Sequence, residues 1–117
     1  MRETLKAAFA AEMAMAAEAR RSQDLNRAFW HLARAHILSQ RHTWPHVRSH
    51  IAMLAIGWQR QDWREIVGQI MRIAAALIFS RIWVPLGNTG GANVNPLKPM
   101  PIPEDLRALL LDTRDQG

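Results

Sequence analysis

Residues 25–40 read LNRAFWHLARAHILSQ, and this stretch decides the fold class. Apolar and small side chains recur in it at helical spacing and form one stripe: Ala28, Phe29, Leu32, Ala35 and Ser39. The charged side chains lie on the opposite face. The stretch therefore predicts an amphipathic helix whose small residues allow close packing against other helices.

The residues before it predict a partner helix from about residue 4 to residue 20, because they are mostly Ala, Leu, Lys, Glu, Met and Arg. Its stripe is Leu5, Phe9, Met13 and Ala16. A short turn ends at Asp24, a candidate N-cap of the next helix. The pair resembles one tetratricopeptide-type hairpin. No second copy follows at a period near ~34 residues, so a repeat array is not expected.

Two more helices are expected downstream. Pro45 suits the first turn of a helix over residues 46–61. Asp62 and Glu65 read as a capping box that starts a helix over residues 63–82, with Glu65 reaching back to Asp62. The stripe of this helix is expected to face the core: Ile66, Val67, Ile70, Ile73, Ala74 and Leu77. No segment alternates with period two, so no sheet is expected.

The composition changes after residue 84. Residues 85–103 contain five of the six prolines and the turn-forming string GNTGGANV at 87–94. We expect an irregular wrap that lies against the helices, because four of its side chains require burial: Val94, Leu97, Met100 and Ile102. After Pro103, Glu104 and Asp105 favour the start of a short last helix.

The predicted fold is therefore all-α and a single domain. A four-helix bundle-like array with the tetratricopeptide-like N-terminal hairpin occupies residues 1–84, and the Pro/Gly-rich wrap occupies residues 85–103. The C-terminal helix and tail occupy residues 104–117, of which 112–117 are expected to fray.

All five histidines fall within twenty residues: His31, His36, His42, His46 and His50. Imidazole is the commonest side-chain metal ligand. His46 and His50 are four residues apart, so one helix face can offer both to one ion. Their motif, HVRSH, lacks the catalytic Glu of the zinc-protease motif. The alternative is that they are two polar positions on a basic helix.

His31 and His36 lie on either side of the stripe of their helix, about 140° apart. Either could approach the pair on the next helix, and three nitrogens plus water would form an open, catalytic-type site. The alternative is that both are boundary histidines bonded to backbone or water. His42 lies in the turn and is expected to have no special role. Glu12 is a possible further ligand, with a solvated carboxylate as the favoured interpretation.

The absence of Cys excludes disulfides, Cys-ligated zinc, iron–sulfur clusters and thiol catalysis. Zinc, iron and copper remain admissible, whereas calcium and magnesium prefer oxygen ligands. Imidazole must be neutral to bind, so affinity is expected to fall below about pH 6.5.

The net charge of +5 is concentrated where no acid occurs, between Leu25 and Gln61. This positive charge favours an acidic protein partner, and it is too small to predict binding to nucleic acid. Trp63 with Arg60 and Arg64 could mark a protein or membrane interface. Neither a signal peptide nor an apolar run of ~20 residues is present. A cytoplasmic protein without a transmembrane segment is expected, with peripheral membrane contact left open.

Three blocks resemble one family: FWHLARAHILSQ at 29–40, HxxxHxxML at 46–54, and GNTGGANV at 87–94 with PMPIP at 99–103. They are similar to a bacterial family of small proteins described only as a domain of unknown function. The resemblance spans most of the chain. It implies that the three blocks belong to one design, and it implies no activity.

The leading hypothesis is a transition-metal site at the seam of the second and third helices, in an accessory protein or a small metal-dependent enzyme. Its candidate ligands are His31, His36, His46, His50 and Glu12. The alternative is a tetratricopeptide-like adaptor that holds an acidic protein partner with its basic and Trp-bearing surface. Convergence of histidines from two helices would distinguish the two.

Overall fold

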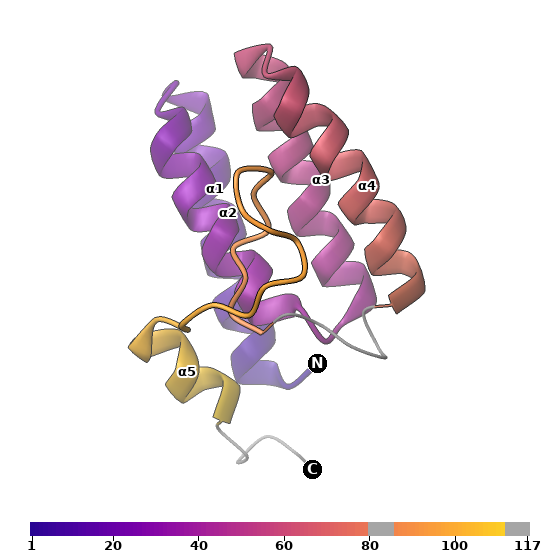
Figure 1. Cartoon of the computed structure of the whole chain (residues 1–117). Helices are drawn as coiled ribbons and strands as arrows, with labels where there is room; N and C mark the ends of the chain where they lie inside the picture. The colour runs from indigo at the N-terminus through magenta and orange to yellow at the C-terminus, as the bar shows by residue number, and fades with distance from the viewer. Residues whose placement is uncertain (80–85, 112–117) are drawn as a thin grey trace.

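The computed structural model describes residues 1–79 and 86–111 (Figure 1). Its helices are α1 Glu3–Arg21, α2 Leu25–Ser39, α3 Thr43–Arg60, α4 Trp63–Phe79 and α5 Glu104–Leu111. No strand occurs in these two ranges, so the all-α prediction is confirmed. The hairpins α1–α2 and α3–α4 lie side by side, and the segment from residue 86 to residue 102 crosses in front of α2 and α3 (Figure 1).

Both hairpins turn through a Gln–Asp pair, Gln23-Asp24 and Gln61-Asp62. Each Gln adopts a left-handed φ, 62° and 56° respectively. Each Asp donates its N–H back to the helix that has just ended and caps the next helix with its side chain. The bonds are Asp24 N–Ala19 O (2.9 Å), Arg27 N–Asp24 Oδ1 (3.2 Å), Asp62 N–Gly57 O (2.9 Å) and Glu65 N–Asp62 Oδ1 (3.1 Å). Both predicted N-caps are therefore confirmed.

Two local expectations are wrong. Helix α3 begins at Thr43 rather than at residue 46, and Pro45 lies in its first turn, where its missing N–H costs nothing. Glu65 does not reach back to Asp62, because the Asp62 N–H already bonds to Gly57; its carboxylate turns into the protein instead. The expected end of the fourth helix at 80–82 and the expected fraying of 112–117 lie outside the described residues.

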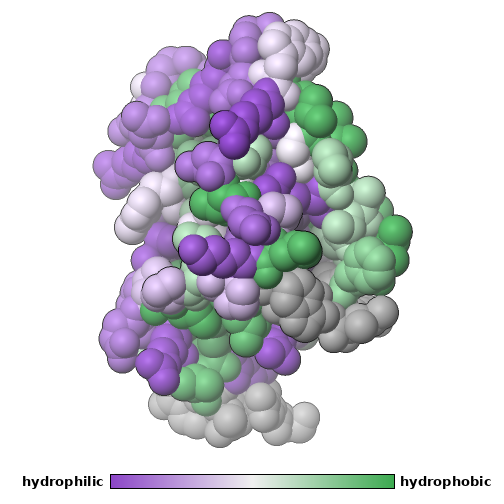
Figure 2. Space-filling model, viewed as in Figure 1, coloured by the Kyte–Doolittle hydropathy of each residue, from purple (hydrophilic) through white to green (hydrophobic). Residues whose placement is uncertain are grey.

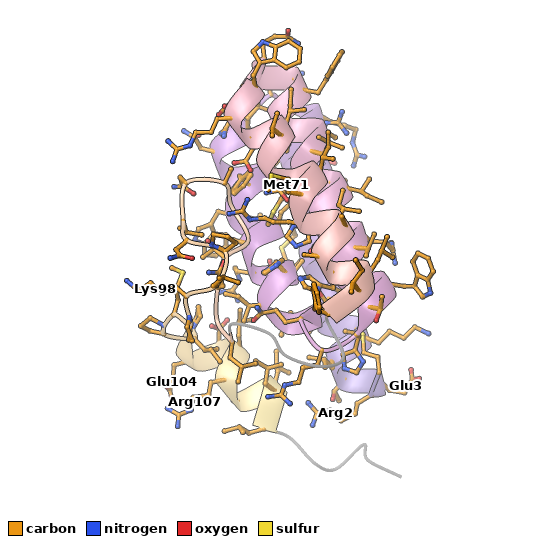
Figure 3. All side chains as sticks on the ribbon, turned by 45° about the vertical axis from the view of Figure 1, so that its right-hand side comes forward. Arg2, Glu3, Met71, Lys98, Glu104 and Arg107 are labelled. Atoms are coloured by element: carbon orange, nitrogen blue, oxygen red, sulfur yellow. The ribbon has the colours of Figure 1, made fainter. Side chains whose placement is uncertain are left out.

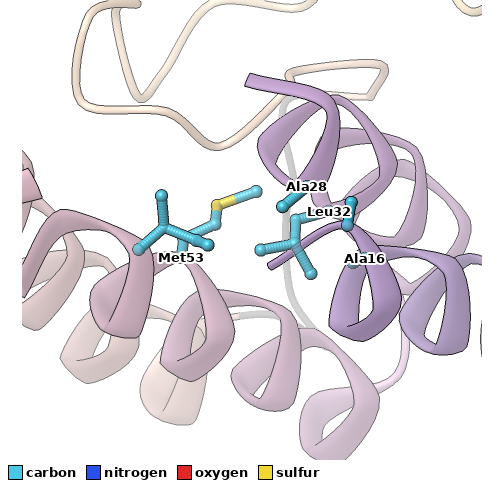
Figure 4. Close-up of a cluster of buried hydrophobic side chains, with 6 residues drawn as sticks. Ala16, Ala28, Leu32 and Met53 are labelled. Atoms are coloured by element: carbon cyan, nitrogen blue, oxygen red, sulfur yellow. The ribbon is translucent and has the colours of Figure 1, made fainter. Parts of the chain in front are cut away.

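Two clusters of buried hydrophobic side chains occur among the described residues. The first joins α1, α2 and α3 through Ala16, Ala19, Ala28, Leu32, Met53 and Ile56 (Figure 4). Its alanines let the backbones approach closely, as the stripe of residues 25–40 predicts. The second lies where α5 meets α1 and α2, and its buried members are Leu5, Ile37, Leu38 and Leu106. Arg2, labelled in Figure 3, closes this end by donating from Nη2 to the carbonyls of Leu109 (2.6 Å) and Leu110 (3.1 Å).

Helix α4 buries only part of its predicted stripe. Ile66 is buried and Ile73 is half-buried, as expected. Val67, Ile70 and Leu77 were expected in the core, and they are 56%, 54% and 50% exposed. Ala74 is also exposed, and the side chains buried together with Ile66 are Glu65, Gln69 and Ala76. Although α4 is very apolar, none of the described helices has the length and apolarity needed to cross a bilayer.

The segment after residue 85 forms the expected irregular wrap. Met100 N donates to Leu86 O (3.0 Å) and closes it into a loop. Ile102 packs against the second core cluster, and Val94 and Met100 are half-buried. Leu97 is 66% exposed, so its predicted burial is wrong. The wrap is held mainly by hydrogen bonds to the helices, which are described next.

Candidate metal centre

Three histidines converge where α2 ends and α3 begins. His36 lies in the last turn of α2, and His46 and His50 lie in the first two turns of α3. The short connection between the helices brings these turns together, and all three side chains are buried. The Nε2 atoms lie 3.0 Å apart between His36 and His46, 3.2 Å between His36 and His50, and 3.2 Å between His46 and His50. We call this group the His triad.

Hydrogen bonds on the far side of two rings fix which nitrogen carries the proton. The His36 Nδ1–H donates to the carbonyl oxygen of Asn88 (2.7 Å), because a carbonyl can only accept. The His50 Nδ1–H donates to Gln69 Oε1 (2.6 Å). In both neutral rings Nε2 therefore holds a lone pair, and the two lone pairs point into the triad.

The orientation of the Gln69 amide is itself fixed. Its Nε2 donates to Glu65 Oε2 and to Gly90 O, both at 2.7 Å. Neither partner can donate to an amide oxygen, so Gln69 Oε1 must face His50. In the chain Glu65–Gln69–His50, a buried carboxylate holds the amide that orients the imidazole. Metal-ligating histidines usually have an acceptor of this kind on their other ring nitrogen.

The spacing of the three nitrogens suits a metal ion. Bonds of about 2.05 Å in a tetrahedral site place nitrogen ligands about 3.3 Å apart, close to the 3.0–3.2 Å of the His triad. A proton on His46 Nε2 could bond to only one of the other two Nε2 atoms at a time. A metal cation would accept all three lone pairs.

The remaining nitrogen of His46 has a different environment from those of His36 and His50. His46 Nδ1 is buried and has no hydrogen-bond partner in the described part of the chain. An unpaired buried polar atom is costly, and such atoms in folded proteins call for a functional or solvent explanation. The His46 ring is therefore positioned by its helix and by the other two histidines, and not by a hydrogen bond from Nδ1.

Burial keeps the His triad neutral. Burial, with the positive charge that His50 would carry, lowers the pKa of His46 to about 3. Burial also lowers the pKa of His50 to about 4, although the hydrogen bond that His50 donates to Gln69 acts in the opposite direction. Burial and the two neighbouring histidines hold the pKa of His36 well below its usual value. Proton competition for the triad therefore begins at a lower pH than the ordinary histidine pKa indicates.

The GNTGGANV loop covers the triad and supplies its supports. Asn88, which is buried, accepts from His36 and donates from Nδ2 to the carbonyls of Asn95 and Lys98, both at 2.8 Å (Lys98 is labelled in Figure 3). Gly90 adopts φ +83°, and a Cβ there would lie 2.8 Å from His36 Nε2. Only glycine fits this position without displacing the imidazole or straining the backbone.

The other predicted site residues lie elsewhere. His31 donates from Nδ1 to Glu12 Oε2 (2.7 Å), and Arg34 donates from Nε to Glu12 Oε1 (2.8 Å) and through Nη2 to Asp105. Glu12 is buried, so the interpretation of a solvated carboxylate is wrong, yet it pairs with His31 and not with the His triad. His42 occupies the N-cap position of α3. Of the four favoured histidines, the structure brings His36, His46 and His50 together, whereas His31 bonds to Glu12 on α1.

Sequence reasoning missed the groups that orient the imidazoles: Glu65, Gln69, Asn88 and Gly90. A signal existed for Gln69, which interrupts an apolar helix one turn after Glu65. Asn88 and Gly90 belong to the GNTGGANV block, whose link to the histidine blocks was suggested by the family resemblance alone. Their distance along the chain from His36 concealed the contact.

The chain belongs to the family described as "Protein of unknown function (DUF3703)", whose model matches residues 3–110. The resemblance to a family defined as a domain of unknown function is thereby confirmed. The matched region includes the whole His triad and the loop that covers it. No curated protein and no solved structure matches the chain.

Proposed function

We propose that this DUF3703 protein binds one transition-metal ion through the Nε2 atoms of His36, His46 and His50. The observation that carries the proposal is the convergence of three buried Nε2 atoms within 3.0–3.2 Å, with the Nδ1–H groups of His36 and His50 already committed to carbonyl oxygens. Neutral imidazoles in this arrangement are ready to bind a cation without first losing a proton.

The donor set indicates the class of metal. It contains three imidazole nitrogens and neither thiolate nor carboxylate, which suits zinc, copper or iron and not calcium or magnesium. By the general order of affinities, zinc(II) and copper(II) should bind more tightly than iron(II). The convergence across α2 and α3 favours metal binding over the adaptor function.

Three protein ligands would leave at least one coordination position for water or another small ligand. Catalytic zinc sites have this composition, whereas structural sites use four protein ligands. The proposed role is therefore a metal-dependent reaction or the handling of the metal itself, with the GNTGGANV loop controlling access to the ion.

The test measures metal binding by tag-free protein. We expect calorimetry with zinc(II), copper(II) and anaerobic iron(II) to show one ion per chain, and elemental analysis to find metal in the purified protein. His46→Ala and His50→Ala should abolish the heat, and the control His42→Ala, which leaves the triad intact, should not. Equal heats for wild type and both triad variants would overturn the proposal.

Cobalt(II) provides a second measurement that does not depend on affinity. A site with three nitrogens and an open position should give visible absorption bands of a four- or five-coordinate ion, and His36→Gln should change them. Circular dichroism of each variant separates loss of a ligand from loss of the fold. A wild-type spectrum like that of hydrated cobalt(II) would contradict the proposal.

A further inference from the structure

Helix α4 has two polar residues on its buried side and most of its large apolar residues on the outside. Glu65 and Gln69 point toward the His triad and the wrap, as their hydrogen bonds to His50, Gly90 and Ala92 show. The opposite side carries six large apolar residues, each at least half exposed: Trp63, Val67, Ile70, Met71, Leu77 and Ile78. We call this the α4 outer face.

The α4 outer face is a continuous apolar surface. Hydrophobic residues gather along the side of the molecule that α4 forms (Figure 2), and Met71, labelled in Figure 3, is 67% exposed. On α3, Trp58 contacts the Trp63 ring (centroids 5.9 Å apart) and extends the surface around the turn. Contiguous exposed patches made of several large apolar side chains mark interaction sites in soluble proteins.

This face carries no charge over three turns. Arg72 is the only charged residue from Val67 to Phe79. It bends back to donate to the carbonyls of Gly68 (3.1 Å) and Val94 (3.0 Å). An acidic partner would find no counter-charge here, and a helix lying on a membrane surface usually has a strongly charged polar face that α4 lacks. The occupant should therefore be apolar itself.

The spacing of the residues points to a helix as the occupant. Trp63, Val67, Ile70, Ala74 and Leu77 are separated by four, three, four and three residues, and all are exposed. This is the heptad seam along which two helices pack side by side. A seam of this kind is complementary to a second copy of itself.

The exposed area is sufficient for a dimer. The six side chains of the α4 outer face together with Trp58, which is 60% exposed, present on the order of 800 Å², the share that one partner contributes to a standard interface of roughly 1,600 Å².

We propose that the chain forms a homodimer in which the α4 outer faces of two copies pack against each other about a two-fold axis. The two α3–α4 hairpins then form a four-helix unit, and the apolar stripe of α4 becomes the core between the copies. The proposal does not require a metal in the His triad.

The test is the mass of the full chain in solution. We expect light scattering after gel filtration to give a dimer at micromolar concentration. Ile70→Glu with Leu77→Glu should give a monomer with unchanged helical content, and the control Met15→Glu, at an exposed apolar residue of α1, should stay dimeric. A monomeric wild type, or a charged double variant that remains a folded dimer, would overturn the proposal.

Two further measurements identify the occupant. Because the chain has no Cys, Ala74→Cys introduces a single thiol on the seam. Oxidation should cross-link two copies, and Met15→Cys at the same concentration should not. Wild-type protein should stay in solution with vesicles of phosphatidylcholine and phosphatidylserine. Binding to these vesicles as a monomer would assign the face to a lipid surface and overturn the dimer.

Discussion

At the scale of single residues, Gln69 has the widest consequences. Its side chain is fully buried and connects Glu65, His50 and Gly90, which belong to two helices and the wrap. Because its amide can face only one way, it fixes the proton of His50 on Nδ1. Gln69 is not a candidate ligand, yet it determines whether His50 Nε2 has a lone pair available for a metal ion.

Replacing Gln69 should therefore weaken metal binding while leaving all three ligands in place. Gln69→Leu keeps the volume and removes both the acceptor for His50 and the donors to Glu65 and Gly90. We expect zinc affinity to fall about 10–100-fold by calorimetry. The control is Gln59→Leu on α3, whose side chain contacts Arg20 and Gln23 at the surface. Unchanged affinity in Gln69→Leu would count against an orienting role.

The low pKa values of the His triad predict how stability depends on pH. Above pH 6.5 the histidines are neutral in both the folded and the unfolded chain. Below it the unfolded chain takes up protons, whereas His50 and His46 stay neutral in the folded protein down to about pH 4 and about pH 3. The unfolded state then binds more protons, so metal-free protein loses stability as the pH falls through this window.

We expect the free energy of unfolding to fall by up to about 1.4 kcal/mol per pH unit for each histidine between pH 6.5 and pH 5. Urea denaturation of metal-free protein at several pH values measures this slope. His46→Gln with His50→Gln should flatten it. A wild-type slope equal to that of the double variant would show that the triad titrates normally.

At the scale of elements, the Gln–Asp turns make the two hairpins alike. Asp62 satisfies a backbone N–H of α4 and ends α3, so one residue defines two helix boundaries. Asp62→Ala should lower the free energy of unfolding by about 1 kcal/mol through the lost cap. Asp24→Ala should cost a similar amount at α2. Chemical denaturation measures both, and a negligible effect of Asp62→Ala would refute the cap.

The wrap depends on Gly90 for its approach to the His triad. Gly90→Ala places a methyl group against the His36 ring and forces a positive φ on alanine. We expect a loss of about 1–3 kcal/mol in stability, together with weaker zinc binding as the loop moves away. Asn93→Ala, at an exposed position of the same loop, is the matched control. Unaltered stability and affinity in Gly90→Ala would show that the loop can move without affecting the site.

At the scale of the whole molecule, the His triad connects the two helical hairpins and the wrap. It links α2 to α3 directly, and through Gln69 and Asn88 it links both to α4 and the wrap. The first core cluster already packs α2 against α3, whereas α4, as far as the structure describes it, contributes no buried residue to either cluster. A bound ion would therefore stabilise the arrangement of the two hairpins.

Zinc at about one hundred times its dissociation constant should add roughly 2.7 kcal/mol to the free energy of unfolding. Thermal unfolding should show a higher midpoint with zinc, and a chelator should reverse the shift. His46→Gln should abolish it. A shift that survives in His46→Gln would place the stabilising ion elsewhere in the protein.

The sequence by itself determined the helices, their caps and the ligand candidates. Helical spacing in residues 25–40, the N-caps Asp24 and Asp62, and the i, i+4 pair His46 and His50 are local features. Local features depend on backbone geometry and on near neighbours along the chain, so a sequence reveals them. The family resemblance added that the loop and the histidine blocks belong together.

Only the tertiary structure decided which histidine joins the pair and which face of α4 is buried. Spacing along the chain gave no reason to prefer His36 over His31. In the structure His31 pairs with Glu12 of α1, and His36 is the one that joins the pair on α3. Hydrophobic periodicity centred the buried side of α4 between Ile66 and Val67. The buried side is centred on Gln69 instead, because His50, Gly90 and Ala92 satisfy the polar groups of Glu65 and Gln69. Hydrogen bonds between residues distant in sequence outweighed the local pattern, because a buried polar group needs a partner that only the assembled fold provides.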